Sequence, residues 1–571
     1  MSLIDVEDVS FTYRTQPDEA ALTDVSVSVE QGEFIGITGP SDAGKTTLCR
    51  LFPGYIPNFF DGELTGTVTV DGTDIRETSI GDMSSQVGLV FENPFDQLTG
   101  ASMTVLEEVA FGLENMGLPR GEIIDRVHES LETVGIEDLI GRNPQELSGG
   151  QSQRLAIASI LAMQPDILVL DEPTSQLDPK GTEEVFEVVA QMDQEGYTVI
   201  LVSQDLERLA PHLDRLWVFE DGQLQLDGPP QEVLTSDDPA LDSVTIPEVV
   251  EIGSRLRSSG LVDGDTPVPL SLGNTVEELR PHITPQQRAN GGAETATTAS
   301  ATTTGTNDAE IEIDDIHFYY NDEIHALRGI SLTLQSGCIC MIGQNGAGKT
   351  TFAKHLNGLL EPDEGRVVVN GMDTQDHTVA ELAHEVGFSF QNPDDQLFHS
   401  NVREEVQYGP RNLGYDEETI ERLTDEAMDE LDLTAVAEKN PYDLGLPRRK
   451  RVAVASVLAM DTPIVVLDEP TGGQDGPGNQ LLGAVVEDLV AAGKLVIVIT
   501  HDVSFARDHA DRVIALGQGE VLLDGDPRTV FSEEATLAET MVEPPKVTRI
   551  GNRLELPETV LTIDELFAHV G

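Results

Sequence analysis

Short apolar runs alternate along the chain with longer stretches in which apolar and polar residues are interspersed. Residues 34–37, 167–170 and 199–202 are apolar at nearly every position, which is typical of strands buried on both faces of a sheet. Residues 182–194 have the spacing of a helix instead. Because strands and helices in alternation usually build a parallel sheet, the pattern predicts an α/β fold that binds ligands at the carboxyl ends of its strands.

The same pattern of motifs occurs twice. The segment 39–47 (GPSDAGKTT) recurs as 343–351 (GQNGAGKTT), and the segment 169–174 (VLDEPT) recurs as 466–471. The copies lie about 300 residues apart in both cases. A nearly constant offset over such a distance indicates a duplicated domain.

The duplication continues past these motifs. Residues 247–256 resemble residues 545–554, and Thr-Val-Glu-Glu-Leu at 275–279 resembles Thr-Ile-Asp-Glu-Leu at 562–566. Each half is therefore expected to end in a small, helical C-terminal extension.

These repeats set the expected domain boundaries. We expect a first domain over residues 1–283 with its extension at about 240–283, and a second domain over residues 310–571 with its extension at about 537–571. Residues 284–309 are rich in Ala, Thr and Gly and lack apolar periodicity, which indicates a flexible linker. A linker of this kind typically spans roughly 25–30 Å, enough to let two domains face each other.

The pattern Gly-x-x-x-x-Gly-Lys-Thr follows an apolar strand in both halves, as expected of a phosphate-binding loop. Backbone N–H groups of such a loop point at phosphate oxygens, and the helix that follows adds its positive dipole end. Lys45 and Lys349 are expected to reach the β- and γ-phosphates, and Thr46 and Thr350 to offer a hydroxyl to Mg²⁺. A glycine turn before a helix is the alternative. The loop residues predicted to bind ATP are Gly39, Gly44, Lys45, Thr46, Thr47, Gly343, Gly346, Gly348, Lys349, Thr350 and Thr351.

Carboxylates follow a second apolar strand in each half. Asp171 and Asp468 stand where a carboxylate can hold Mg²⁺ directly or through water. The next residues, Glu172 and Glu469, are placed to polarise an attacking water. An exposed loop start is the alternative, but the coupling to a phosphate loop in both copies favours the catalytic interpretation.

One further motif identifies a family. Residues 147–154 read Leu-Ser-Gly-Gly-Gln-Ser-Gln-Arg, shortly before the first Asp-Glu strand. With the phosphate loop, this signature resembles the ATP-binding-cassette (ABC) ATPases, and the resemblance implies two tandem P-loop NTPase domains, each with a helical signature subdomain. It also implies that the signature caps the γ-phosphate bound by the opposite domain, so that the two cassettes pair within the chain. The signature residues concerned are Ser148, Gly149, Gly150 and Gln151.

The same resemblance places an aromatic residue under adenine after the first strand, which here is Tyr13 or Tyr320. Stacking on a base is physically reasonable, although a tyrosine in a strand is as often simply packed.

A second segment narrows the family. Residues 391–398 read Gln-Asn-Pro-Asp-Asp-Gln-Leu-Phe and are echoed at 92–98, a segment that looks like the ATPases of energy-coupling-factor (ECF) transporters, importers of cobalt, nickel and vitamins. The resemblance implies that Asp96, Asp394 and Asp395 receive arginines from coupling helices of a transmembrane partner. A solvated acidic face is the alternative. It further implies a separate substrate-binding membrane subunit, and extensions that help to hold the two ATPase domains together.

The two halves differ at positions near the nucleotide, and every difference falls on the site between the first-half loop and the second-half signature. The first half has Asp42, Glu92 and Gln204 where the second has Gly346, Gln391 and His501. The second signature, residues 444–451, reads Leu-Gly-Leu-Pro-Arg-Arg-Lys-Arg, so that Pro447 removes an N–H donor and Leu446 adds bulk. Arg448 and Arg449 could offset the negative charge that Asp42 and Glu92 add.

The other site, between the second-half loop and the first-half signature, retains all of the motif residues. Lys349 and Asp468 stand there with Glu469, His501 and Gln391 as catalytic residues, and Gln391 is also a candidate Mg²⁺ ligand. We therefore expect the second-half loop site to carry most of the ATP hydrolysis. Glu172 survives in the weaker site, so slow hydrolysis there is the alternative, as is a signature variant accepted among fused ECF ATPases.

Composition narrows the class of partner. Acidic residues outnumber basic ones 102 to 34, a formal net charge of −68. That balance argues against binding to nucleic acid or anionic lipid, which relies on Lys and Arg. The excess is spread along the whole chain, as on the solvated surface of a halophilic protein.

Nothing in the sequence predicts a secreted or membrane-spanning protein. The three cysteines, Cys49, Cys338 and Cys340, cannot build a disulfide framework, and no apolar run approaches the ~18–20 residues of a membrane span. We expect an ATPase with ATP and Mg²⁺ as ligands, peripheral on the cytoplasmic face of the membrane, that powers an importer. Alternatives are a conventional ABC importer ATPase, or a soluble twin-cassette ATPase acting on ribosomes or DNA.

Overall fold

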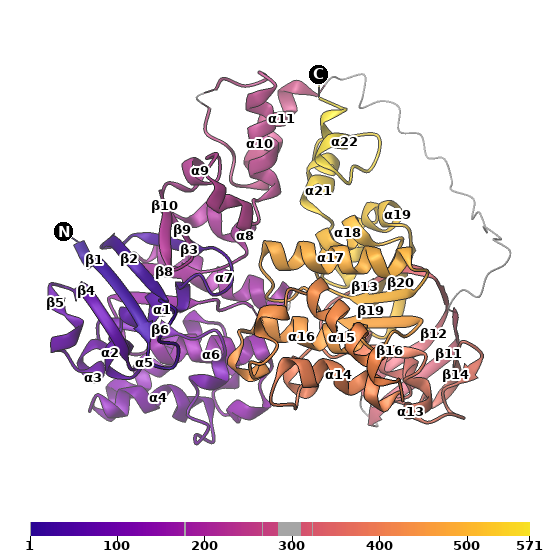
Figure 1. Cartoon of the computed structure of the whole chain (residues 1–571). Helices are drawn as coiled ribbons and strands as arrows, with labels where there is room; N and C mark the ends of the chain where they lie inside the picture. Colours follow the sequence, from indigo (N-terminus) through magenta and orange to yellow (C-terminus); the bar gives the residue numbers. More distant parts are fainter. Residues whose placement is uncertain are drawn as a thin grey trace. The chain divides into compact units, whose positions relative to one another are not determined.

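The computed structural model describes residues 2–175, 177, 179–264, 266–283, 310–321 and 324–570 (Figure 1). The predicted linker, 284–309, lies outside the described residues. The chain forms two compact units, Met1–Asn274 and Thr275–Gly571. The division falls within helix α11 (Leu272–Leu279), at the end of the first predicted domain.

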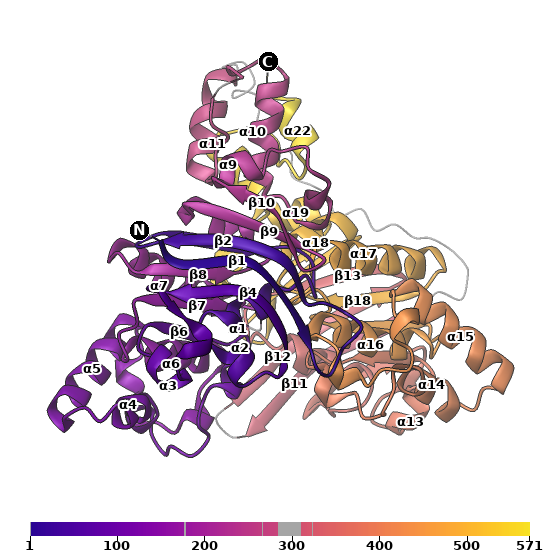
Figure 2. The ribbon, with the colours of Figure 1, turned by 60° about the vertical axis from the view of Figure 1, so that its left-hand side comes forward.

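Unit 1 contains two sheets. The antiparallel sheet has the order β2 (Leu22–Glu30), β1 (Ser2–Tyr13), β4 (Gly62–Val70), β5 (Thr73–Asp74), and Figure 2 shows its three long strands lying together. The central sheet has the order β10 (Gln223–Gly228), β9 (Arg215–Glu220), β3 (Phe34–Thr38), β8 (Thr198–Val202), β7 (Ile167–Asp171), β6 (Val87–Val90). All central neighbours are parallel except β9 and β10. The carboxyl ends of β3 and β7 therefore meet at one edge, separated only by β8.

The predicted buried strands are confirmed. Every residue of β3, β7 and β8 is buried, because the sheet is covered on both faces. The helix expected over 182–194 is the greater part of α7 (Pro179–Gln194).

The remaining helices of unit 1 are mostly short. They are α1 (Lys45–Leu51), α2 (Tyr55–Asn58), α3 (Ile80–Met83), α4 (Val105–Asn115), α5 (Arg120–Thr133), α6 (Gly149–Leu161), α8 (Leu206–Leu209), α9 (Pro230–Val233) and α10 (Glu248–Ser258). Helices α4, α5 and α6 pack on one another and form the helical subdomain. Helix α1 contributes Leu48, Cys49 and Leu51 to a core that also includes residues of β1, β2 and β3.

Unit 2 repeats this plan. Its antiparallel sheet has the order β12 (Ile324–Gln335), β11 (Glu310–Asn321), β14 (Glu364–Val369), β15 (Met372–Asp373). Its central sheet has the order β16 (Val386–Ser389), β17 (Ile464–Asp468), β18 (Leu495–Ile499), β13 (Gly337–Ile342), β19 (Arg512–Gly517), β20 (Glu520–Gly525). Its helices are α12 (Lys349–Leu356), α13 (Val379–Leu382), α14 (Val402–Asn412), α15 (Glu417–Glu430), α16 (Leu446–Leu458), α17 (Gly476–Ala491), α18 (Val503–His509), α19 (Pro527–Ser532), α20 (Glu534–Glu539), α21 (Lys546–Arg553) and α22 (Ile563–Phe567).

All three cysteines are free and buried. Cys338 and Cys340 alternate along β13 and share one core of unit 2, as strand periodicity predicts.

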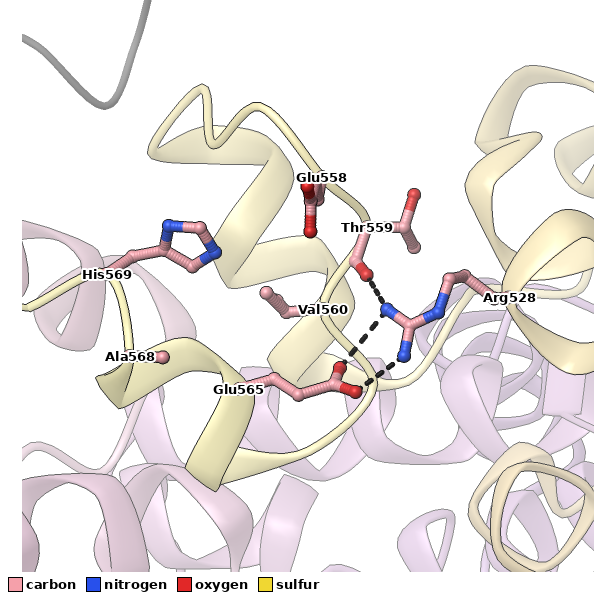
Figure 3. Close-up of a pocket in the computed structure, with 7 residues that line it drawn as sticks. All are labelled: Arg528, Glu558, Thr559, Val560, Glu565, Ala568 and His569. Carbon is pink, nitrogen blue, oxygen red and sulfur yellow. Dashed lines mark hydrogen bonds and ion pairs between the residues drawn. The ribbon is translucent and has the colours of Figure 1, made fainter. Parts of the chain in front are cut away.

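An arginine of α19 binds residues near the end of unit 2. Arg528 of α19 forms an ion pair with Glu565 of α22 at 2.5 Å and donates a hydrogen bond to the carbonyl oxygen of Thr559 (Figure 3). The side chains enclose a pocket of about 410 Å³, lined by Arg528, Glu558, Thr559, Val560, Glu565, Ala568 and His569. Within the same unit, Ile283 pairs with Val570 in an antiparallel bridge.

Candidate nucleotide-binding sites

The first phosphate loop joins β3 to α1 through two glycines that no other residue could replace. Gly39 has a φ of +135° and Gly44, the N-cap of α1, a φ of +92°. A Cβ on Gly39 would lie 2.0 Å from the carbonyl oxygen of Phe219. The loop therefore requires glycine for both conformation and space.

The loop lysines are buried and point into their own loops. Lys45 Nζ donates hydrogen bonds to the carbonyl oxygens of Gly39 at 2.8 Å and Pro40 at 2.7 Å. Lys349 Nζ makes the equivalent bonds to Gly343 at 2.5 Å and Gln344 at 3.1 Å. Both ammonium groups are thus held over the concave side of a loop built to receive phosphate.

The threonine and the aspartate predicted to hold Mg²⁺ meet in both halves. Thr46 Oγ1 donates to Asp171 Oδ1 at 3.2 Å, and Thr350 Oγ1 donates to Asp468 Oδ2 at 2.7 Å. Burial raises the pKa of Asp468 to about 6, and its Oδ1 is buried without a hydrogen-bond partner among the described residues. A buried carboxylate oxygen beside a hydroxyl fits Mg²⁺, whose charge would stabilise the ionised form and neutralise phosphate.

Glu469 is fixed by a histidine. It is 5% exposed, has a φ of +52°, and its Oε2 lies 2.7 Å from His501 Nδ1. Burial by itself would raise the pKa of Glu469, but the charge and hydrogen bond of His501, aided by Lys349 and Lys450, lower it below its usual value. The adjacent glutamate charge raises the pKa of His501. Both shifts favour a protonated His501 and an ionised Glu469, and a general base must be ionised.

Glu172 has a different environment. Burial raises its pKa to about 7, with a further contribution from the charge of Glu92. The residue at the histidine position, Gln204, uses its Nε2 to donate to the carbonyl oxygen of Gly39 at 2.8 Å. At neutral pH a large share of Glu172 is therefore protonated and unable to accept a proton from water.

The loops also differ in backbone chemistry. Asp42 has a φ of +64° and the equivalent Gly346 a φ of +79°. The first half thus keeps the left-handed conformation with a residue that adopts it at a cost of about 1 kcal/mol.

The two signature helices start differently. Ser148 Oγ accepts a hydrogen bond from the N–H of Gln151, and Gln151 Oε1 accepts one from the N–H of Ser148, which makes a capping box at the start of α6. Gly149 and Gly150 follow in the first turn, where N–H groups point out of the helix. Helix α16 starts at Gly445 without a side-chain cap and has Pro447 in its first turn.

The two tyrosines, one in each half, make equivalent contacts with a threonine of the phosphate loop. Tyr13 OH and Tyr320 OH lie 3.1 Å from the hydroxyls of Thr47 and Thr351. Tyr320 is 53% exposed, which leaves much of its side chain accessible beside the loop. Thr47 and Thr351 are buried and hold these tyrosines in place.

The acidic residues predicted to contact a partner are exposed but not alike. Asp96 and Asp395 are exposed. Asp394 is also exposed, but it accepts hydrogen bonds from Arg449 of α16 at 2.8 and 3.1 Å. The first half has Phe95 and Ser152 at these two positions. The candidate catalytic residue Gln391 is exposed as well.

Sequence reasoning missed two groups beside the sites. Arg50 donates to Tyr13 OH at 3.2 Å and lies 4.4 Å from the centre of the Phe60 ring. Lys450 donates to the carbonyl oxygen of Glu469 at 3.0 Å. The basic run at residues 448–451 was a signal, but only the fold separates its members: Arg449 binds Asp394 and Lys450 binds Glu469.

Within the described part of the chain, no helix is both long and apolar enough to cross a membrane.

Comparison with known proteins covers both halves. The family model for the ABC transporter matches residues 22–175 and 327–472. A protein of Caldanaerobacter subterraneus subsp. tengcongensis, whose name describes an ABC transporter ATP-binding protein, is 36% identical over 567 residues, 98% of this chain and 97% of its own. A Methanosarcina mazei protein with the same description is 36% identical over 574 residues, 99% of this chain and 96% of its own. The solved structure of cbiO1 from Clostridium perfringens, described as part of the ABC transporter complex cbiONQ, matches at 30% identity with a TM-score of 0.38, over 46% of this chain and 96% of its own.

Proposed function

The chain belongs to the ABC transporter family of ATP-hydrolysing proteins, and from this premise we propose that it powers an ECF-type importer of a vitamin or a transition-metal ion. Its position would be peripheral, on the cytoplasmic face of the membrane. The segment Asn-Pro-Asp-Asp-Gln at 392–396 and the repeated extensions support the ECF type. A separate membrane subunit would select the substrate.

We propose further that the cassettes pair head to tail and that the two composite sites are unequal. The second-half loop would face Ser148, Gly149 and Gly150, and it has the ionised Glu469 held by His501. The first-half loop would face Leu446 and Pro447, and it has a Glu172 whose pKa is about 7. The contact between the Glu469 carboxylate and His501 Nδ1 at 2.7 Å is the observation that carries this proposal, since removal of one positioned group typically slows such chemistry about 10²–10³-fold.

The matched pair Glu469→Gln and Glu172→Gln tests the assignment. Steady-state ATP hydrolysis should fall about 100-fold or more in Glu469→Gln and less than threefold in Glu172→Gln. Equal losses in the two variants would contradict unequal sites.

Pairing of the cassettes is tested by a cross-link. All three natural cysteines are buried, so Ser148→Cys with Asn345→Cys provides the only reactive thiols in the folded protein. In a Glu469→Gln background, ATP and Mg²⁺ should promote the disulfide, and ATP-free protein should form little of it. Failure to cross-link with ATP bound would overturn head-to-tail pairing.

Coupling to the membrane partner is proposed to run through the exposed carboxylates Asp96 and Asp395. Positive residues of the partner would be attracted to them, so the combined Asp96→Lys and Asp395→Lys variant should lose co-purification with integral membrane subunits. Glu417→Lys, at an exposed position of α15, is the matched control and should retain them. Co-purification of the unmodified chain with ribosomes instead would favour a soluble twin-cassette ATPase.

A further inference from the structure

Glu469 is held by three contacts, two to its backbone and one to its side chain. Its N–H donates to the carbonyl oxygen of Ile499 at 2.8 Å, its carboxylate binds His501, and its carbonyl oxygen accepts the ammonium of Lys450 at 3.0 Å. A left-handed, non-glycine residue is strained and persists only where its surroundings fix it. Two of these contacts stay within the central sheet and the loops that follow its strands, whereas the third comes from the signature helix α16.

In the first half, the carbonyl oxygen of the equivalent glutamate has a hydrogen-bond partner other than a lysine. The carbonyl oxygen of Glu172 accepts the N–H of Ser175, a local turn at 3.3 Å. Gln153 stands at the position of Lys450 and directs its amide to the carbonyl oxygen of Phe91 at 3.4 Å. The contact between signature helix and glutamate is therefore a property of the second half.

Space for the lysine is provided by a second difference between the halves. Gly472 stands where the first half has Ser175, and a Cβ on Gly472 would lie 2.8 Å from Lys450 Nζ. Gly472 does not have a positive φ, and a side chain at this position would crowd the ammonium of Lys450. The lysine and the glycine thus form one matched pair.

Charge strengthens the contact. Burial lowers the pKa of Lys450, and the charges of Glu469 and Asp468 offset only part of this effect. Lys349, His501 and Lys450 are the cations that face Glu469, and Asp468 is the nearby anion. An ammonium that hydrogen-bonds the carbonyl oxygen also stabilises the ionised carboxylate of the same residue.

We propose that Lys450 is a positioning residue: it transmits the position of the signature helix α16 to the backbone of Glu469, so that the base is aligned only when the helical subdomain is in place. Gln474, whose Nε2 donates to the carbonyl oxygen of Pro447 at 2.9 Å, supports the same connection from the loop after β17. The inference rests on the proposed hydrolytic role of Glu469.

The test uses the full-length chain in a Glu172→Gln background, so that hydrolysis reports the second-half site. Lys450→Met should lower kcat about tenfold with the KM for ATP changed less than twofold, because a displaced base loses rate while nucleotide still binds. Lys450→Arg keeps the charge and should retain most of kcat.

A steric variant separates position from charge. Gly472→Ala adds a methyl group against the ammonium and should reproduce the loss of kcat with Lys450 still present. Lys494→Met is the matched control, since Lys494 Nζ also binds a carbonyl oxygen, that of Thr462 at 3.0 Å, at the opposite end of β17. Thermal unfolding should report a folded protein in every case.

The outcomes distinguish the role of Glu469 as the base from the role of Lys450 as a positioning residue. If Glu469→Gln in the same background retains kcat, the assignment of the base is wrong. If Glu469→Gln abolishes turnover while Lys450→Met and Gly472→Ala keep the kcat of the background, the positioning role alone is overturned.

Discussion

At the scale of single residues, two glutamates of identical local sequence differ in their charged neighbours, above all in a histidine. Glu172 and Glu469 both follow a buried strand, both have positive φ, and both precede Pro-Thr. His501 provides a charged partner to Glu469, whereas Gln204 provides none to Glu172. Burial therefore raises the pKa of Glu172 to about 7 but does not keep Glu469 protonated.

This difference predicts that ATP hydrolysis at the two sites depends differently on pH. A base must be ionised, and a glutamate becomes ionised as pH rises through its pKa. Residual hydrolysis in Glu469→Gln should therefore increase as pH rises through about 7, whereas hydrolysis in Glu172→Gln should already be independent of Glu469 ionisation at pH 6. Rates of ATP hydrolysis between pH 5.5 and 8.5 check this. Parallel profiles in the two variants would contradict it.

At the scale of elements, α19 and α22 are joined by Arg528, which binds Glu565 and the carbonyl oxygen of Thr559 (Figure 3). The first half has Gln231 at the corresponding position, so this ion pair is not repeated there. Both side chains are partly exposed, which limits the contribution of the pair to about 1 kcal/mol or less. The contact thus orders a terminal helix and adds little to global stability.

Arg528→Gln is expected to loosen α22 locally. Amide hydrogen exchange in residues 563–567 should accelerate severalfold, because local opening no longer breaks the ion pair, while ATP hydrolysis and the midpoint of thermal unfolding stay unchanged. Arg422→Gln is the control, since Arg422 forms an exposed ion pair with Glu426 inside α15. Unchanged exchange in α22 would show that apolar packing alone holds this helix.

At the scale of the whole molecule, the net negative charge is expected to govern how stability depends on salt. A formal net charge of −68 makes the folded chain repel itself, and salt shortens the range of that repulsion from ~10 Å at 0.1 M to ~3 Å at 1 M. We propose that the chain is adapted to high salt. Its free energy of unfolding should increase by several kcal/mol between 0.1 and 2 M KCl, measured by urea denaturation. A stability independent of KCl would contradict this adaptation.

The sequence by itself determined everything that rests on contiguous residues. Two cassettes, their phosphate loops and the buried strands all follow from motifs in which local spacing and burial point to the same structure. Glycines such as Gly39 were recognisable because the loop conformation excludes other residues. These features need no knowledge of which distant segments meet.

The tertiary structure decided which of the basic residues at 448–451 faces which carboxylate. Arg449 reaches Asp394, and Lys450 passes Gly472 to reach the carbonyl oxygen of Glu469, over sequence separations of 55 and 19 residues. It also decided the protonation of the two glutamates, because a pKa depends on burial and on charges brought close by the fold. Such contacts depend on side-chain direction after the helices have packed, and local sequence does not encode that direction by itself.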